Sequence, residues 1–226
     1  MEFIDIATER TTAATDLLLA LVALASIVYL ARVGQGRDPW KARIWSWAFG
    51  LLTFASAMGA VAHGFKMSEQ LNRLLWQPLN LALGLTIAMF AVGVVYDKWG
   101  QLASRRVLPI LIAVGVVFFG VTIVIPGSFL VFILYEAVTM LFALVVYVLL
   151  VARKQLAGAA VMAAGILITI VAAAVQASGA VFVKIIWEFD YNGIFHLIQV
   201  VGVVVLVAGL RTAMYARAGE AGDAPQ

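Results

Sequence analysis

The two histidines of the chain, His63 and His196, lie in apolar segments, and each has polar neighbours at helical spacing. Ser56 precedes His63 by seven residues, so the two share one face of a helix. Asn192, His196 and Gln199 are spaced by four and then three residues and share another face. Two imidazoles with amide or carboxylate oxygens could hold a zinc ion and an activated water.

Glu136 is the one carboxylate that the sequence places well inside an apolar run. A carboxylate in lipid becomes neutral or finds a partner, so a histidine, an amide, a metal or a cationic ligand should face it. In a metal site Glu136 would be a ligand or the general base. Ser56 could donate to a developing oxyanion, although a single serine in such a helix more often links two helices.

The other polar candidates fall at a similar depth in their segments, and the opposite half of each segment is mainly aliphatic. This pattern predicts a polar pocket above an apolar floor. Asp16 has a second interpretation as the N-cap of the first helix, and His63 as an interfacial residue before a turn. The candidates that line this pocket are Asp16, Gln77, Asn80, Tyr135, Gln176 and Gln199.

Of the 226 residues, 64% are hydrophobic and only 12% are charged. Soluble domains are about half apolar and about a quarter charged, so this is a membrane composition. Seven runs are long enough to cross a bilayer as helices, at 15–33, 44–62, 79–95, 107–125, 129–152, 156–182 and 191–213. We expect an all-α membrane protein in which residues 1–215 form a single seven-transmembrane helix bundle, followed by a disordered cytoplasmic tail at 216–226.

Basic residues set the expected orientation. With the N-terminus outside and the C-terminus inside, eleven of the fifteen lysines and arginines fall on the inner side. This sorting accounts for the basic loops, so no nucleic-acid partner is expected. The chain is predicted to be integral to a cell or bacterial inner membrane, with the pocket on the extracytoplasmic side.

The seven spans, a histidine that ends the second span and the polar-x3-His element Asn192-Gly-Ile-Phe-His196 resemble the CREST superfamily of membrane hydrolases. This superfamily includes alkaline ceramidases and adiponectin-receptor relatives. The resemblance implies a zinc ion held by His63 and His196, with Asn192 where the family has a histidine. It also implies metal-dependent hydrolysis of lipid amide or ester bonds.

The chain departs from that pattern at two further places. The family's serine falls on Gly59, so Ser56 is the nearest hydroxyl, and the family's aspartate has only Gln77 or Asn80 as a counterpart. Membrane lipids and a lipid-like small molecule are the partners that the resemblance implies. A degenerate relative that keeps the pocket without the metal fits the same residues.

Other classes fit the same residues. A receptor, a sensor or a lipid-binding protein would use a metal-free, amide-lined pocket, and His63 and His196 could instead be the axial ligands of a haem. Retinal is not expected, because it needs a lysine within a span and Lys184 lies in a loop. A channel or pump is disfavoured, because no charged path continues through the inner half.

Overall fold

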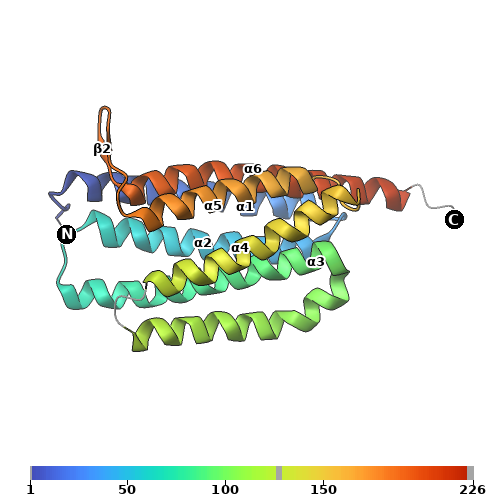
Figure 1. Cartoon of the computed structure of the whole chain (residues 1–226), viewed down its shortest axis with the longest axis horizontal. Coiled ribbons are helices and arrows are strands. Elements are labelled where there is room, and N and C mark those ends of the chain that lie inside the picture. Colours follow the sequence, from blue (N-terminus) through green and yellow to red (C-terminus); the bar gives the residue numbers. More distant parts are fainter. Residues whose placement is uncertain (1, 126–128, 223–226) are drawn as a thin grey trace.

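The computed structural model describes residues 2–125 and 129–222. It consists of helices and one short hairpin (Figure 1). The elements are α1 (Ala7–Gly34), α2 (Pro39–Gly64), α3 (Glu69–Val124), α4 (Phe129–Ala152), α5 (Ala159–Ser178), β1 (Val183–Lys184), β2 (Glu188–Phe189) and α6 (Tyr191–Gly222). Within this part of the chain six helices are long and apolar enough to cross a membrane, so the protein is an integral membrane protein.

Helix α3 is two helical halves joined at Gly100. The backbone of Gly100 has φ 82°, in the left-handed region that glycine adopts without a steric penalty, and this residue interrupts the regular helix. Figure 1 shows the second half running back beside the first. Gly84 and Gly115 face each other across the two halves, since a Cβ on Gly115 would lie 2.9 Å from the Gly84 carbonyl oxygen.

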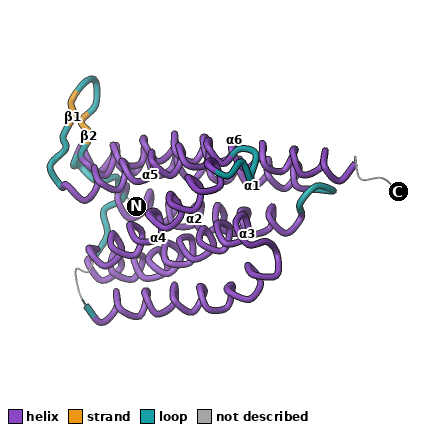
Figure 2. Tube along the Cα trace, turned by 45° about the vertical axis from the view of Figure 1, so that its right-hand side comes forward, coloured by secondary structure: helices purple, strands orange, loops and turns teal. Residues whose placement is uncertain are grey.

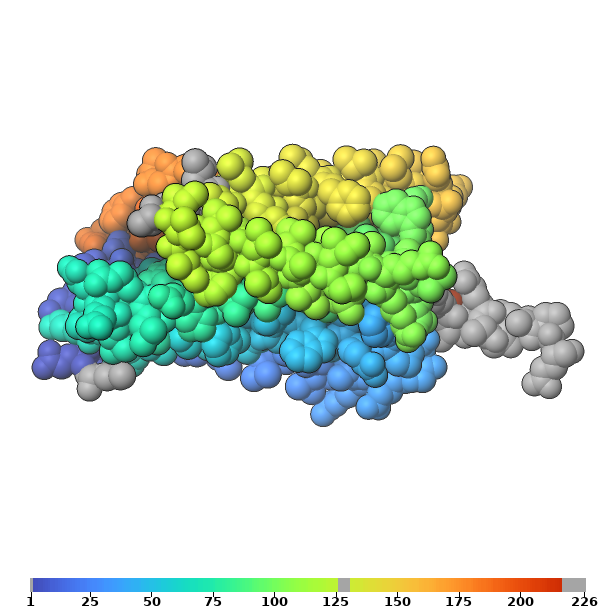
Figure 3. Space-filling model, turned by 90° about the horizontal axis from the view of Figure 1, so that it is seen from below, coloured from blue at the N-terminus to red at the C-terminus, as the bar shows by residue number. Residues whose placement is uncertain are grey.

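The helices form a closed ring. Each packs against its neighbours in sequence, and α6 returns to pack against α1 (Figures 1 and 2). The second half of α3 forms an outer layer and lies beside α4 on the surface in Figure 3. There Phe118 contacts Phe132 and stacks on Tyr135 at 5.2 Å between ring centroids. Side chains from α1 to α6 line the interior of this ring.

Local signals in the sequence explain several helix boundaries. Asp38 caps α2, because its side chain accepts a hydrogen bond from the Lys41 backbone N–H, and Pro39 follows at the first helical position. Ser68 caps α3 in the same way through Leu71. Helix α1 begins at Ala7 with Ile6 before it, so Asp16 is an interior residue of the helix and not its N-cap.

The N-terminal residues are tied to the connection between α2 and α3. Phe3 stacks on Phe65, and the backbone N–H of Ile4 donates to the Gly64 carbonyl at 3.0 Å. Lys66 lies 2.6 Å from Asp5 and lowers the pKa of that exposed carboxyl group below its ordinary value. These contacts bring the start of α1 and the end of α2 together, at what we call the N-terminal end of the bundle.

Between α5 and α6 the chain forms a hairpin that the sequence did not predict. Its strands pair Val183 with Phe189 and Lys184 with Glu188, and Figure 2 shows it standing away from the helices. The Thr11 hydroxyl donates to the Glu188 carbonyl at 2.6 Å, which attaches the base of the hairpin to α1. At the other end of the bundle α6 continues to Gly222, within the segment expected to be disordered, and residues 223–226 lie outside the described part.

Candidate functional site

The ring encloses a cavity of about 670 Å³, and residues from all six helices line it. This volume is typical of pockets for small ligands. The cavity wall includes eight of the eleven residues that the sequence predicted for the site: Asp16, Ser56, His63, Glu136, Gln176, Asn192, His196 and Gln199. Helices that are far apart in the sequence therefore converge as expected.

The other three predicted residues lie outside the cavity wall. Gln77 is exposed and Asn80 is half-buried near the start of α3. Tyr135 stacks on Phe118, and its hydroxyl donates to the Gly84 carbonyl at 3.5 Å. Tyr135 thus links α4 to both halves of α3, while its neighbour Glu136 takes the position that faces the ring interior.

His196 is held by two side chains of α1. Its Nε2 lies 3.2 Å from Asp16 Oδ1, and its Nδ1 lies 3.2 Å from the Thr15 hydroxyl. The Thr15 hydroxyl also donates to the Thr12 carbonyl at 2.9 Å. Both ring nitrogens of His196 are therefore engaged within the protein, and the ring orientation is fixed.

Asp16 also depends on a glycine of α2. A Cβ on Gly59 would lie 2.7 Å from Asp16 Oδ2, which is closer than real side-chain carbons come. Gly59 is the position at which the resemblance suggested by the sequence would lead one to expect a serine. Here the absence of a side chain leaves room for the Asp16 carboxylate between α1 and α2.

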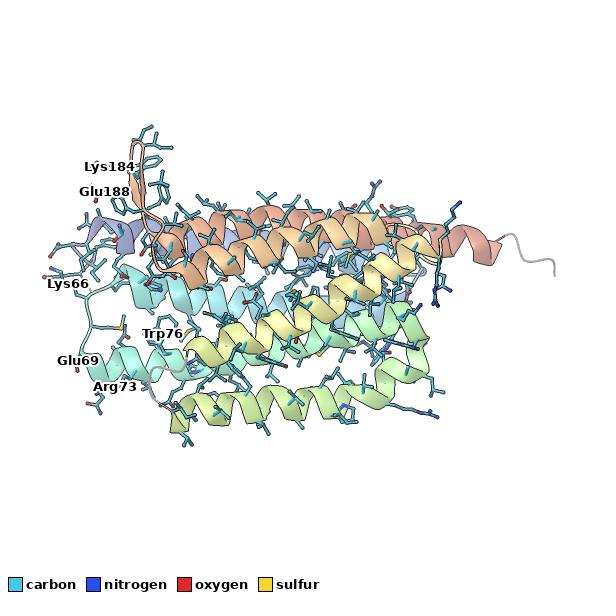
Figure 4. All side chains as sticks on the ribbon, viewed as in Figure 1. Lys66, Glu69, Arg73, Trp76, Lys184 and Glu188 are labelled. Carbon is cyan, nitrogen blue, oxygen red and sulfur yellow. The ribbon has the colours of Figure 1, made fainter. Side chains whose placement is uncertain are left out.

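His63 pairs with Glu9, a residue that the sequence interpretation missed. Its Nδ1 lies 2.6 Å from Glu9 Oε2, and its ring meets the edge of Trp76 at 5.6 Å between centroids. Figure 4 shows Trp76 on the first half of α3, near the N-terminal end of the bundle. Glu9 and Asp16 are two turns apart on α1, so a spacing of seven residues could have indicated that Glu9 shares the face of Asp16.

Glu136 differs from the other two carboxylates of the cavity. It is only 7% exposed, and its Oε2 has no partner among the residues that the structure describes. No ion pair to it is found in the same part of the chain. A buried carboxylate without a partner is costly, so Glu136 is the most strained electrostatic feature of the site.

Two glutamines of the cavity wall also have unpartnered oxygens. The Gln176 amide N–H donates to Asn192 Oδ1 at 3.3 Å, and the Gln199 amide N–H donates to the Thr169 hydroxyl at 3.4 Å. The buried oxygens Gln176 Oε1 and Gln199 Oε1 have no hydrogen-bond donor within residues 2–125 and 129–222. One N–H of each amide donates within the protein, and the amide oxygens have no donor among the described residues.

The cavity changes from polar to apolar along its length. On α6, Asn192, His196 and Gln199 are followed on the same face by Val203 and Leu206. On α2, read from its C-terminal end, His63 and Ser56 give way to Phe49 and Trp45, and on α4 Met140 follows Glu136 by one turn. The polar groups therefore gather toward the N-terminal end of the bundle, and the floor is apolar.

These contacts bear on whether the residues could hold the zinc that the resemblance implies. A zinc ligand must offer a free ring nitrogen. His196 has none, because Asp16 and Thr15 engage both, and Asn192 Oδ1 accepts from Gln176. In the described part of the chain no group of three or more His, Asp or Glu side chains could hold a metal ion. The residues as arranged do not fit zinc, and the occupied nitrogens of His196 do not fit an axial haem ligand either.

A second buried polar cluster lies outside this cavity and was not expected. Lys41 of α2 forms an ion pair with Asp97 of α3 at 2.6 Å, and the Tyr147 hydroxyl donates to Asp97 at 2.7 Å. The two charged side chains are only 2% and 1% exposed. The Tyr96 hydroxyl donates to Asp38 at 2.6 Å beside them. This cluster joins α2, α3 and α4 near the start of α2.

Comparison with known proteins places the chain in a family. No curated protein and no solved structure matches it. One family model does match, over residues 11–215, which include α2 to α5, most of α1 and α6, and the whole cavity wall except Glu9. On this evidence the chain belongs to that family, which is described as "Family of unknown function (DUF6962)".

Proposed function

We propose that the protein is a binding protein for an amphipathic, lipid-like small molecule, in the manner of a receptor, sensor or carrier. The observation that carries the proposal is the cavity itself, which is enclosed by six helices, polar at one end and apolar at the other. Its wall also contains three buried oxygens that lack a donor among the described residues, on Glu136, Gln176 and Gln199. Buried polar atoms without a partner favour a site that a ligand or water completes.

The binding function needs no metal, which agrees with the occupied ring nitrogens of His196. The metal-dependent lipid hydrolase predicted from the sequence stays a prediction. Zinc analysis of the purified protein tests it directly. Stoichiometric zinc that is lost on His63→Ala would favour the hydrolase over the binding protein.

The proposal includes the membrane topology. The two halves of α3 each cross the membrane once, which makes seven spans, and the excess of basic residues places the N-terminal end of the bundle outside. The polar end of the cavity then opens to the extracytoplasmic side. Because the chain has no cysteine, single cysteines report the topology cleanly. A membrane-impermeant maleimide should label Ile186→Cys in intact cells and label Gln35→Cys only after the membrane is opened.

Binding can be tested by filling the cavity. Val203 of α6 lines the cavity and is fully buried, while its neighbour Val204 is 55% exposed on the outer surface. Val203→Trp should abolish binding of dodecanol to the purified protein, and Val204→Trp should leave it unchanged. Equal binding by both variants would overturn the proposal. Ser56→Leu, which narrows the polar end, gives an independent check if Val203→Trp does not fold.

A further inference from the structure

The charges of the cavity wall are unbalanced. The wall contains three carboxylates, Glu9, Asp16 and Glu136, and two histidines, and no lysine or arginine lines it among the described residues. Glu9 pairs with His63 and Asp16 pairs with His196. Glu136 alone lacks such a partner. A buried carboxylate in this position either becomes neutral or pairs with a positive group, and in the described part of the chain such a group would have to come from outside.

The neighbouring hydrogen-bonding groups point the same way. One amide N–H of Gln176 and one of Gln199 donate within the protein, and the buried oxygens of both amides have no donor in the described residues. Together with Glu136 Oε2 they make three acceptors on α4, α5 and α6, the helices that pack in sequence along one side of the ring. A ligand that satisfies them must carry N–H or O–H groups.

The position of Glu136 along its helix fits the polar end of an amphiphile. It lies seven residues after the start of α4, about 10 Å along the axis, and Met140 continues the same face one turn deeper. Phe49 and Phe90 lie deeper still on α2 and α3. A charged head group at Glu136 would therefore have its alkyl chain against these apolar side chains.

We propose that the ligand of this cavity is an alkyl amine whose protonated amino group pairs with Glu136. This inference rests on the binding function proposed above and names the ligand class. A primary ammonium group supplies both the positive charge that Glu136 lacks and an N–H donor for its unpartnered oxygen. A quaternary ammonium group supplies the charge without N–H donors, so it would leave the buried oxygens without a hydrogen bond.

The test compares three probes with the same alkyl chain: dodecylamine, dodecanol and dodecyltrimethylammonium. Calorimetric titration of the purified protein is done near pH 7, where an alkyl amine is protonated, like a lysine side chain. The variants are Glu136→Gln, which removes the charge and keeps the shape, and Glu69→Gln, the same change at an exposed residue of α3 (Figure 4). The wild type should bind dodecylamine at least about tenfold more tightly than dodecanol.

In Glu136→Gln this preference should disappear while the dodecanol affinity stays at the wild-type value. In Glu69→Gln the preference should remain. Dodecyltrimethylammonium should bind more weakly than dodecylamine to the wild type. If Glu136→Gln does not fold, Gln199→Leu removes one of the three acceptors and should reduce the preference for dodecylamine several-fold.

The outcomes separate the two proposals. Equal binding of dodecylamine and dodecanol to the wild type, or an unchanged preference in Glu136→Gln, overturns the amine assignment and leaves the binding function standing. Binding of none of the three probes overturns the binding function itself. Tighter binding of dodecyltrimethylammonium than of dodecylamine overturns the role of the N–H donors.

Discussion

Asp16 of α1 packs directly against Gly59 of α2, at a place where a methyl group on Gly59 would lie 2.7 Å from the Asp16 carboxylate. This contact allows the two helices to approach while the carboxylate still reaches His196. This close approach of α1 and α2 is therefore also part of the cavity wall.

Gly59→Ala should push Asp16 away from His196 and strain the α1–α2 contact. We expect a loss of stability of about 1–3 kcal/mol, as for other overpacked interiors. Gly50→Ala in the same helix is the matched control, because its added carbon would lie 3.8 Å from Ile27, an ordinary contact. Thermal unfolding in detergent measures both variants. A melting temperature for Gly59→Ala equal to that of Gly50→Ala would contradict the packing argument.

The two carboxylate–histidine pairs should differ in strength. Asp16–His196 is longer, at 3.2 Å, but both of its side chains are about nine-tenths buried or more, whereas Glu9–His63 is shorter, at 2.6 Å, and partly exposed. Burial removes the competition from water, so it should raise the coupling energy of a pair more than a shorter distance does. Double-mutant cycles to alanine should give a coupling energy of about 1–3 kcal/mol for the buried pair and below about 1 kcal/mol for the other. A larger coupling energy for Glu9–His63 would show that distance matters more than burial for the strength of these pairs.

Breaking the ion pair outside the cavity should be costly. Lys41→Met leaves Asp97 buried without its cation, with an expected loss of about 3–5 kcal/mol. Combining it with Asp97→Leu and Tyr147→Phe removes both the orphaned carboxylate and the hydroxyl that donates to it. The triple variant should recover most of the lost stability in chemical unfolding. A triple variant no more stable than Lys41→Met would mean that the charges themselves are required.

Gly100 should be required for the reversal of α3. Its φ of 82° with ψ of −175° is a conformation that essentially only glycine adopts and that costs other residues about 1–3 kcal/mol, although nothing lies within 4 Å of an added Cβ. Gly100→Ala should therefore lower stability through backbone strain alone. Gly120→Ala in the same helix also meets nothing within 4 Å, and its φ is not in the strained range, so it should be neutral or slightly stabilising. Equal effects of the two changes on the unfolding temperature would exclude strain at Gly100.

The sequence predicted the helices well, because long apolar runs leave few alternatives in a membrane. The prediction for residues 129–152 coincides with α4. The prediction for the first helix, 15–33, began too late, since the structure starts α1 at Ala7. Glu9 and the threonines before Asp16 do not extend the apolar run, so the sequence contains no sign of this earlier start. Once helix α1 is known to begin at Ala7, the spacing of Glu9 and Asp16 becomes informative.

The polar residues of the site were largely predictable, but their pairing was not. Depth in a span can be counted along the chain, and this count brought together residues such as Ser56, Glu136 and His196. Which carboxylate meets which histidine depends on α1 lying between α2 and α6, and ring closure sets that arrangement. The burial of Lys41 could not be predicted for a related reason. Its partners Asp97 and Tyr147 are far away in sequence, so only the fold shows that the residue is buried.

The gradient from polar to apolar along the cavity has an energetic consequence. The floor of the cavity and the interior of a bilayer are solvents of similar polarity, so an alkyl chain that moves from one to the other gains little hydrophobic free energy. With the proposed topology, the head group also keeps its depth relative to the outer leaflet. Discrimination among lipids must then come almost entirely from the few side chains at the polar end, whatever the length of the chain below them.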